Sequence, residues 1–395
     1  MTINQGAATT YVELVTLTLD ASGQGGITHM YLSRNGSFAD GSWVPYQTSY
    51  AFDCVDLATT STATITFHVK FKDAAGNVSA EATDSIELKR TLVSGTMATA
   101  THWTPAASPY YVTATTTFSG TAPLTIDPGT EVYFKAGSKL LLQGGISAVG
   151  TASLPIRLGG AVLWLDYARA WVTAGRPPTF NLDGSYARGP HFEHVLANDG
   201  EIHIVNVVFD GPGFYMSQCT LGQVTSEYKL DGTYIEHSRI TTMGTDSGDL
   251  EMANTKIRNS YITFLGMNGY EWPVEITHCQ IDVFFIDRWH PDNTLEYNTL
   301  KQITWYRPTE TKPAVMHNNN IDSAASPLLR VDRGCDVIGV VDATGNYWGA
   351  TATAQMASSA YNITAIFDNW DDATLDRVDF AGYLTAPVVG AGPDW

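Results

Sequence analysis

Apolar and polar residues alternate over short runs in the first 90 residues of the chain. The runs cover residues 11–19, 27–32 and 64–71, and clusters rich in Gly, Asn and Asp separate them. A period of two is typical of strands that bury one face against a core. The pattern therefore predicts a β-sandwich over residues 1–90, which the run 84–88 closes.

From residue 124 onward the pattern changes to a repeat of short apolar strands. The aligned aliphatic residues step by 22, 19, 19 and 21 positions. A period of about 20 is too short for a propeller blade or a helix-pair repeat, and the leucine spacing of leucine-rich repeats is missing. One coil of a parallel β-helix fits, because each coil stacks its strands on those of its neighbours. The aligned residues are Ile240, Ile262, Ile281, Leu300 and Ile321.

Alternation within each copy separates an inward column from outward ones. The inward column is expected to contain Ile235, Ile257 and Ile276, and the residue after each of them is expected to point outward. A second column stands three places before the aligned aliphatics and is expected on the inward side. It consists of His237, Asn259, His278, Tyr297 and Asn318.

This second column has two interpretations. Its two histidines would be acid–base groups in an enzyme, but they are two coils apart, about 10 Å, which disfavours direct cooperation. A stacked polar ladder that satisfies buried turn backbone is the interpretation that we favour.

The stretch between the two patterns is rich in Thr, Ala, Ser and Pro. Residues 91–120 are therefore predicted to be a linker and an N-terminal cap, because segments of this composition carry few crossing contacts. The β-helix is expected over residues 121–349, and a C-terminal closing segment over residues 350–395.

Three short stretches of the first 90 residues carry a likeness to a known family. They are residues 26–33, with Gly-Ile-x-x-Met-x-x-Ser, residues 43–46, with Trp-Val-Pro-Tyr, and residues 71–79. This part resembles the bacterial Ig-like domains of surface adhesins and phage virion proteins. The resemblance implies display, spacing or adhesion rather than chemistry.

The repeat region carries a second likeness. Residues 124–134 look like an opening coil, residues 342–349 contain Asn-Tyr-Trp-Gly, and residues 366–384 look like a closing segment. The region resembles the right-handed parallel β-helix proteins of the pectate-lyase-like superfamily. Together the two resemblances imply an all-β chain, with an Ig-like β-sandwich followed by a right-handed, single-stranded parallel β-helix. That superfamily includes lyases, hydrolases, epimerases and inert spikes, so it implies no single activity.

The charge balance excludes some classes of binding partner. The chain has 22 basic and 40 acidic residues, a net charge of −18 and a pI near 4.8. Phosphate backbones and anionic bilayers select Lys and Arg, so neither nucleic acid nor a membrane surface is an expected partner. No apolar stretch reaches the 18 or so residues that span a bilayer, so membrane insertion is not expected. The first residues lack the basic and apolar regions of a signal peptide, which would fit release by lysis.

The cysteines do not have metal-ligand spacing. They lie 165, 60 and 56 residues apart, without a Cys-x-x-Cys pair or a Cys/His cluster. No metal site and no cofactor are therefore predicted. Buried free thiols are expected, with one tertiary disulfide as the alternative. The four residues are Cys54, Cys219, Cys279 and Cys335.

Polysaccharide cleavage is one candidate chemistry. A glycosidase needs two carboxylates about 5–5.5 or 6.5–9.5 Å apart, and stacked coils place residues of one column about 5 or 10 Å apart. Most carboxylates of an acidic chain are ordinary solvated groups, and the motifs of calcium-dependent pectate lyases are absent. The weak catalytic candidates are Glu236, Glu251, Glu275, Asp282 and Asp287.

Carbohydrate binding is the other candidate. Aromatic residues follow successive ladder strands and stand beside charged ones, and sugar rings stack on exposed aromatic faces. The alternative is an inward aromatic stack, especially for Phe284 and Phe285. The predicted ligand-binding residues are Trp272, Asp287, Arg288, Trp289, Trp305, Tyr306 and Arg307.

The sequence therefore favours a non-enzymatic structural or adhesive surface protein. A bacteriophage virion appendage, such as a tail spike, fibre or decoration protein, fits best, with host-surface polysaccharide and other virion or surface proteins as partners. Its expected location is the virion or the cell exterior. A homotrimer stays open, since nothing resembles a tailspike trimerisation domain. The alternatives are a polysaccharide depolymerase, either lyase or glycoside hydrolase, and a secreted bacterial adhesin.

Overall fold

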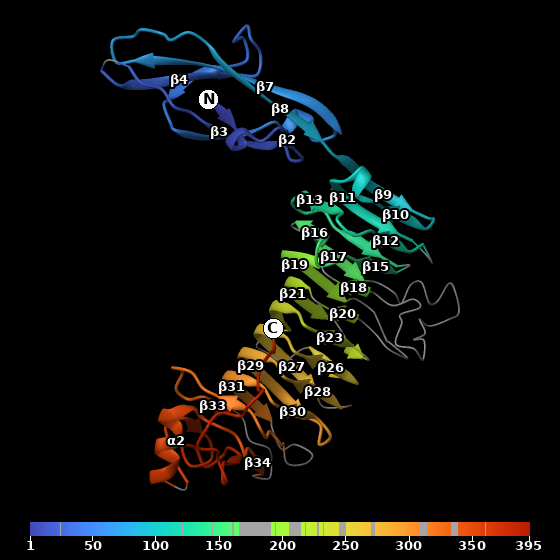
Figure 1. The fold of residues 1–395 in the computed structure, drawn as a ribbon, viewed down its shortest axis with the longest axis vertical. Helices are drawn as coiled ribbons and strands as arrows, with labels where there is room; N and C mark the ends of the chain where they lie inside the picture. Colours follow the sequence, from blue (N-terminus) through green and yellow to red (C-terminus); the bar gives the residue numbers. More distant parts are fainter. Residues whose placement is uncertain are drawn as a thin grey trace. The chain divides into compact units, whose positions relative to one another are not determined.

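The computed structural model divides the chain into two compact units (Figure 1). The first unit contains Met1–Ser94 and Ala106–Thr113, and the second contains Gly95–Pro105 and Ala114–Trp395. The structure describes residues 1–395 except 24, 120–121, 144, 160–161, 166–190, 194, 205–214, 218, 227–228, 232, 245–249, 270–272, 308–313, 333–338 and 360.

The first unit is built from two β-sheets. One has the order β1-β3-β6 and the other β2-β8-β7-β4-β5. The first sheet contains β1 (Thr2–Ile3), β3 (Leu14–Thr18) and β6 (Ser49–Asp53). The second contains β2 (Thr9–Thr10), β4 (Ile27–Ser33), β5 (Ser42–Pro45), β7 (Thr62–Asp73) and β8 (Ala82–Lys89).

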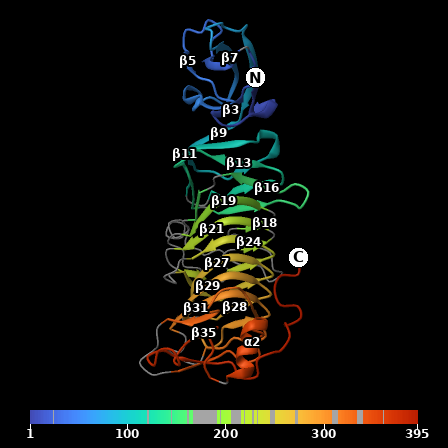
Figure 2. The same cartoon turned by 90° about the vertical axis from the view of Figure 1, so that its left-hand side faces the viewer.

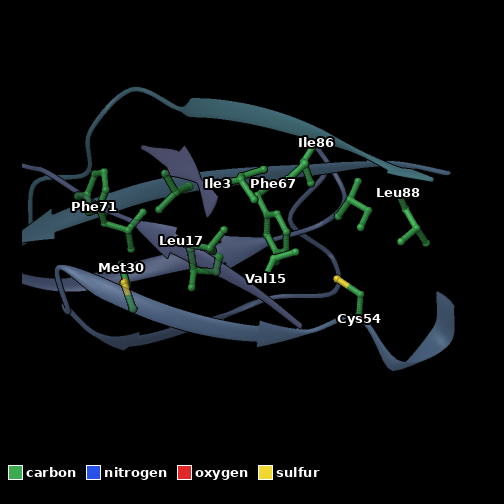
Figure 3. Packing of buried hydrophobic residues seen from close by; sticks show 13 residues of the cluster. Ile3, Val15, Leu17, Met30, Cys54, Phe67, Phe71, Ile86 and Leu88 are labelled. Carbon is green, nitrogen blue, oxygen red and sulfur yellow. The ribbon is translucent and has the colours of Figure 1, made fainter. Parts of the chain in front are cut away.

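Both sheets contribute to one hydrophobic core (Figure 3). Val15 and Leu17 come from β3, Met30 from β4 and Phe67 from β7, and each is fully buried. Burial alternates along β3, as the period-two pattern predicts. The all-β character of this part is confirmed, whereas its likeness to Ig-like domains stays a prediction.

A buried ion pair ties the returning segment 106–113 into the first unit. Arg90 donates to Glu13 at 3.1 Å and to the carbonyl of Leu57 at 2.8 Å. The Tyr111 hydroxyl donates to the other Glu13 oxygen at 3.1 Å, and burial beside this carboxylate raises the pKa of Tyr111 to about 12. The network satisfies charges that would otherwise be costly to bury.

The second unit is a parallel β-helix, as the repeat predicts. Its strands pair in parallel with the equivalent strands of the next coil, and Figure 2 shows these rungs stacked from β13 to β35. The nine-stranded sheet contains β10 (Thr101–Trp103), β12 (Leu124–Ile126), β15 (Ile146–Val149), β18 (His191–Glu193), β20 (Tyr215–Ser217), β23 (Tyr234–Glu236), β26 (Thr255–Arg258), β28 (Val274–Thr277) and β30 (Thr294–Glu296).

A larger sheet forms the rest of each coil. It contains β9 (Thr91–Met97), β11 (Tyr110–Phe118), β13 (Glu131–Phe134), β14 (Leu140–Leu142), β16 (Ile156–Gly159), β17 (Val162–Leu165), β19 (Val195–Ile204), β21 (Thr220–Ser226), β22 (Lys229–Asp231), β24 (Arg239–Met243), β25 (Glu251–Ala253), β27 (Tyr261–Gly269), β29 (Gln280–Trp289), β31 (Thr299–Arg307), β32 (Asn320–Ile321), β33 (Leu329–Val331) and β35 (Ile366–Phe367).

The inward aliphatic column is confirmed. Ile235, Ile257, Ile276 and Leu295 stand in register on consecutive strands and are at most 1% exposed. The residues that follow them are only half-buried, on the outer face. Each inward residue therefore packs between the equivalent residues above and below it.

The buried polar column lies one residue later in each coil than the sequence predicts. His237, Asn259, His278, Tyr297 and Asn318 have positive φ angles, of 46°, 46°, 55°, 57° and 56°, so they make the turn itself. None of them is buried. The prediction that they point inward was wrong, because a left-handed residue changes the chain direction and breaks the alternation.

The buried ladder consists of the residues directly after these turns. Asn298 Oδ1 accepts the backbone N–H of Cys279 at 2.8 Å, and Asn319 Oδ1 accepts that of Asn298 at 3.0 Å. Such bonds satisfy turn backbone that water cannot reach. The ladder contains Ser238, Ser260, Cys279, Asn298, Asn319 and Asn346.

The segment expected to be a linker and a cap is built of strands. Residues 91–120 contain β9, β10 and β11, and the backbone N–H of Ser119 donates to the carbonyl of Met97 at 3.0 Å. Thr-rich stretches are good strand formers, so composition alone did not separate a linker from an opening coil.

The closing segment begins within α2 (Gly349–Ser358), and its strand β36 (Arg377–Asp379) pairs with β34 (Val340–Asp342), which precedes it in the chain. The chain then returns along the coils as residues 388–395, here called the C-terminal strap (Figure 1). Val388 exchanges two hydrogen bonds with the Asn320 side chain, and Trp395 Nε1 donates to the Asn259 carbonyl at 2.6 Å. No helix in the described ranges is long and apolar enough to cross a membrane.

Candidate functional site

The two tryptophans predicted to bind ligand are core residues. Trp289 and Trp305 are 2% and 0% exposed, and their rings meet edge to face with centroids 5.1 Å apart. Trp305 is in register with Ile286, inside the coils. The prediction that these rings face outward was wrong, because burying large apolar rings stabilises the stack more than exposing them. Trp272 lies outside the described residues.

A polar row crosses the outer side of four consecutive strands. Glu251 of β25 is in register with Asn268 of β27, and Asn268 Nδ2 donates to Asp287 Oδ2 of β29 at 3.4 Å. Arg307 of β31 binds Asp287 in turn. Asp287 lies in a bend between inward Ile286 and Trp289, and at 6% exposure it is the buried member of this row. Glu251, Asn268, Asp287 and Arg307 are called the polar row below.

The Asp287–Arg307 contact is bidentate. Arg307 Nε donates to Asp287 Oδ1 at 2.9 Å, and one terminal nitrogen donates to both carboxylate oxygens at 2.8 and 2.7 Å. The carboxylate side chain is 9% exposed and the guanidinium side chain 24%. This geometry holds a charged donor and a charged acceptor at a fixed place on the coil surface.

Two half-buried aromatic rings lie beside the polar row. Phe285 and Tyr306 have centroids 6.4 Å apart with planes at 31°, and the Arg307 guanidinium lies 5.5 Å from the Tyr306 centroid. Val283, two residues before Phe285, is 37% exposed. Half-buried Arg288 is in register with Arg307. Asp287, Arg288, Tyr306 and Arg307 are therefore brought together, and their role in binding a ligand stays a prediction.

The remaining carboxylate candidates lie elsewhere and have partners. Glu236 accepts from the Tyr234 hydroxyl at 2.9 Å, on the nine-stranded sheet. Asp282 accepts from Lys301 at 2.7 Å, at the other end of β29.

Glu275 also has cationic partners on the nine-stranded sheet. It accepts from Arg258 Nε at 2.6 Å and pairs with Lys256 at 3.3 Å. Of the five candidates, Glu251 and Asp287 alone share a row within the described chain, and they are two rungs apart.

Sequence reasoning missed Asn268 and misjudged Phe285. Phe284 is fully buried whereas its neighbour Phe285 faces out, as adjacent strand residues must. Asn268, Asp287 and Arg307 are 19 and 20 residues apart, which is the coil period. That spacing was the signal that could have identified the row.

The described residues offer no metal centre, since no group of three or more His, Cys, Asp or Glu side chains has suitable geometry among them. Cys54, Cys219 and Cys279 are buried free thiols, as predicted, and Cys335 lies outside the described residues. Burial raises the pKa of the Cys279 thiol to about 12, which keeps it protonated and unreactive at neutral pH.

Comparisons with known proteins add little. No protein-family profile and no curated protein matches the chain. Among solved structures, it is similar to the Yersinia enterocolitica Family 28 exopolygalacturonase at 8% identity, over 84% of this chain and 80% of that chain, with a TM-score of 0.19. A likeness this weak does not bear on function, so the β-helix assignment rests on the strand pairing described above.

Proposed function

We propose that this protein binds a polysaccharide on the outer face of β29 and β31 and is displayed on a surface without cleaving its ligand. The observation that carries the proposal is the aromatic pair Phe285–Tyr306 beside the bidentate Asp287–Arg307 pair. Sugar rings stack on aromatic faces, and their hydroxyls donate to carboxylates and accept from guanidinium groups.

The coil repeat suits a polymeric ligand. Equivalent positions on successive rungs are about 4.8 Å apart, so a chain lying along the stack meets similar side chains at regular intervals. A site built on strands is also held rigidly, which limits the entropy lost on binding.

Display is supported by the likeness of residues 1–90 to bacterial Ig-like domains. In this proposal the first unit spaces or anchors the β-helix on a phage virion, as a tail spike, fibre or decoration protein, or on a cell surface. Host-surface polysaccharide and neighbouring surface proteins are the partners, and the assembly state, including a homotrimer, belongs to the same proposal.

The test compares Tyr306→Ala with Tyr297→Ala in the full chain, by affinity electrophoresis in gels that contain host-surface polysaccharides. Tyr297 is a matched control because it is 36% exposed at the opposite end of the same coil segment. Loss of one stacked ring should weaken binding about five- to tenfold for Tyr306→Ala alone. Equal affinities for both variants and the wild type would contradict the site.

A depolymerase is the second candidate, since Glu251 and Asp287 share the polar row. Two rungs place their backbones about 10 Å apart, just above the 6.5–9.5 Å separation of carboxylates in inverting glycosidases. Both carboxylate oxygens of Asp287 are already bound by Arg307. Release of reducing ends by the wild type, abolished in Glu251→Gln with binding retained, would favour this candidate. Binding without release supports the non-catalytic function.

A further inference from the structure

The outer face of the five-stranded sheet in the first unit carries a cluster of aromatic rings. Tyr31 of β4 meets Trp43 of β5 edge to face at 5.2 Å, and it meets Phe38 of the intervening loop at 5.4 Å. The Tyr31 hydroxyl donates to the carbonyls of Phe38 and Gly41 at 3.0 and 2.8 Å. The loop is thereby held against the sheet, and the three rings keep a fixed arrangement.

Two lysines of β7 lie over these rings. Lys72 Nζ is 3.9 Å from the Trp43 centroid and Lys70 Nζ is 4.2 Å from that of Phe38. They are two residues apart and thus project from the same side of the strand, about 7 Å apart along it. Neither ammonium has a carboxylate partner among the described residues. The ring contacts therefore position two positive charges that no carboxylate of the described residues neutralises directly.

One carboxylate stands beside these rings: Glu81 pairs with His68 Nδ1 at 2.5 Å, and the His68 ring meets Phe38 at 6.2 Å. The registered partners are Tyr31 with Lys70, Tyr31 with Trp43, and His29 with Lys72, and His29 is exposed. With two lysines and one carboxylate that His68 already engages, this aromatic face keeps an excess of positive charge on a chain whose net charge is −18. We call Tyr31, Phe38, Trp43, Lys70 and Lys72 the lysine–aromatic face.

We propose that the lysine–aromatic face is a second binding site, which takes an acidic polysaccharide of the uronic-acid class. The two ammonium groups pair with carboxylates on the sugars, and the aromatic rings contact the apolar faces of the sugar rings. A nucleic acid fits worse, because its dense phosphates would meet the acidic remainder of the chain. This site is independent of the one on β29 and β31.

The experiment measures retardation of the full chain in native gels that contain alginate, a polymer of uronic acids, with neutral dextran and double-stranded DNA as comparison polymers. The variants are Lys70→Gln/Lys72→Gln and Lys70→Arg/Lys72→Arg. Lys89→Gln is the matched control, since Lys89 is an exposed lysine of the adjacent strand β8. Melting temperatures of all variants are recorded, so that a folding defect is seen directly.

We expect alginate to retard the wild type, the double Arg variant and Lys89→Gln, and the double Gln variant to bind about tenfold more weakly with an unchanged melting temperature. Wild-type binding should weaken with added salt and be absent with dextran and DNA. Undiminished binding by the double Gln variant, an equal loss in Lys89→Gln, or retardation by DNA as strong as by alginate would overturn the proposal. Tyr306→Ala should leave alginate binding intact, which keeps this test distinct from that of the first site.

Discussion

Asp287 has both carboxylate oxygens engaged by the Arg307 guanidinium, in an outer bend of β29 where it is 6% exposed. Removing its charge takes the carboxylate partner away from a guanidinium in a poorly solvated place. We expect Asp287→Asn to lower the free energy of unfolding by about 2 kcal/mol. Urea unfolding followed by circular dichroism measures this.

Asp282→Asn is the control for that prediction. Asp282 pairs with Lys301 at 2.7 Å, but the two side chains are 33% and 41% exposed. Solvent screens such pairs, so the cost should stay within about 1 kcal/mol. Equal losses for the two variants would mean that the bend around Asp287 is as open to water as a surface pair.

The hydrogen bonds of Asp342 predict that the stability of the fold depends on pH. Burial alone would raise the pKa of this carboxyl, but hydrogen bonds from His317 at 2.9 Å and Thr344 at 2.8 Å outweigh it and hold the pKa below its ordinary value of 3.8. A depressed acid pKa stabilises the fold above the ordinary value, and this stability is lost as the pH falls through the folded pKa. Asp342→Asn should therefore melt below the wild type at pH 6.

The wild type and Asp342→Asn should have the same melting temperature once the pH is well below 3.8, because Asp342 is then protonated in the wild type as well. Thermal melts at pH 6 and at the lowest pH where both stay folded provide the comparison. A gap that persists undiminished at the acid end would show that shape, rather than charge, accounts for the effect.

At the scale of the element, the sequence predicted the strands better than the turns. The coil period and the inward column of Ile235, Ile257 and Ile276 follow from hydrophobic spacing, which the core enforces at every rung. The ladder was misplaced because a left-handed residue such as His278 occupies a position without continuing the alternation. The bend at Asp287 shifted the parity of Trp289 in the same way, since two residues rather than one separate inward Ile286 from inward Trp289.

The buried ladder that contains Asn298 leads to a prediction about the stability of the turns. Asn298 Oδ1 accepts the N–H of Cys279 at 2.8 Å, and its Nδ2 donates to the Ile276 carbonyl at 2.9 Å. Asn298→Ala leaves both buried groups without partners and should cost about 3 kcal/mol. Asn318→Gly, at a turn position with φ of 56°, should change stability by less than about 0.5 kcal/mol, because glycine accepts that conformation. Comparable costs from urea titrations would show that the ladder does not satisfy the turns.

At the scale of the whole chain, composition gave the wrong structure for residues 91–120 and contained no sign of the C-terminal strap. Residues 91–97 form β9 although their Thr-rich make-up resembles a linker. The chain passes between the two units three times, after Ser94, Pro105 and Thr113. A single cut in this stretch therefore cannot separate the units cleanly, which a count of turn-forming residues does not reveal. Contacts between Trp395 and Asn259 span 136 residues and leave no local pattern.

The strap yields the last prediction. The Trp395 ring meets Tyr261 edge to face at 5.4 Å, and the Arg239 guanidinium lies 4.8 Å from the ring centroid. The backbone N–H of Gly392 donates to the Tyr297 carbonyl at 2.8 Å. The strap thus joins coils that would otherwise be connected only through their neighbours, and in a stacked repeat such a tie raises the cost of opening the intermediate rungs. Removing residues 388–395 should lower the melting temperature of the second unit by several degrees.

Hydrogen exchange locates the effect of this deletion. Backbone amides of β24 and β27 should exchange faster without the strap, whereas those of β3 and β7 in the first unit should be unchanged. Trp395→Ala should reproduce part of the loss. Trp370→Ala is the matched control, because that ring is 47% exposed in the closing segment and packs only on Tyr361 among the described rings. If the deletion and Trp370→Ala leave the same melting temperature and exchange rates as the wild type, the strap lies on the coils without stabilising them.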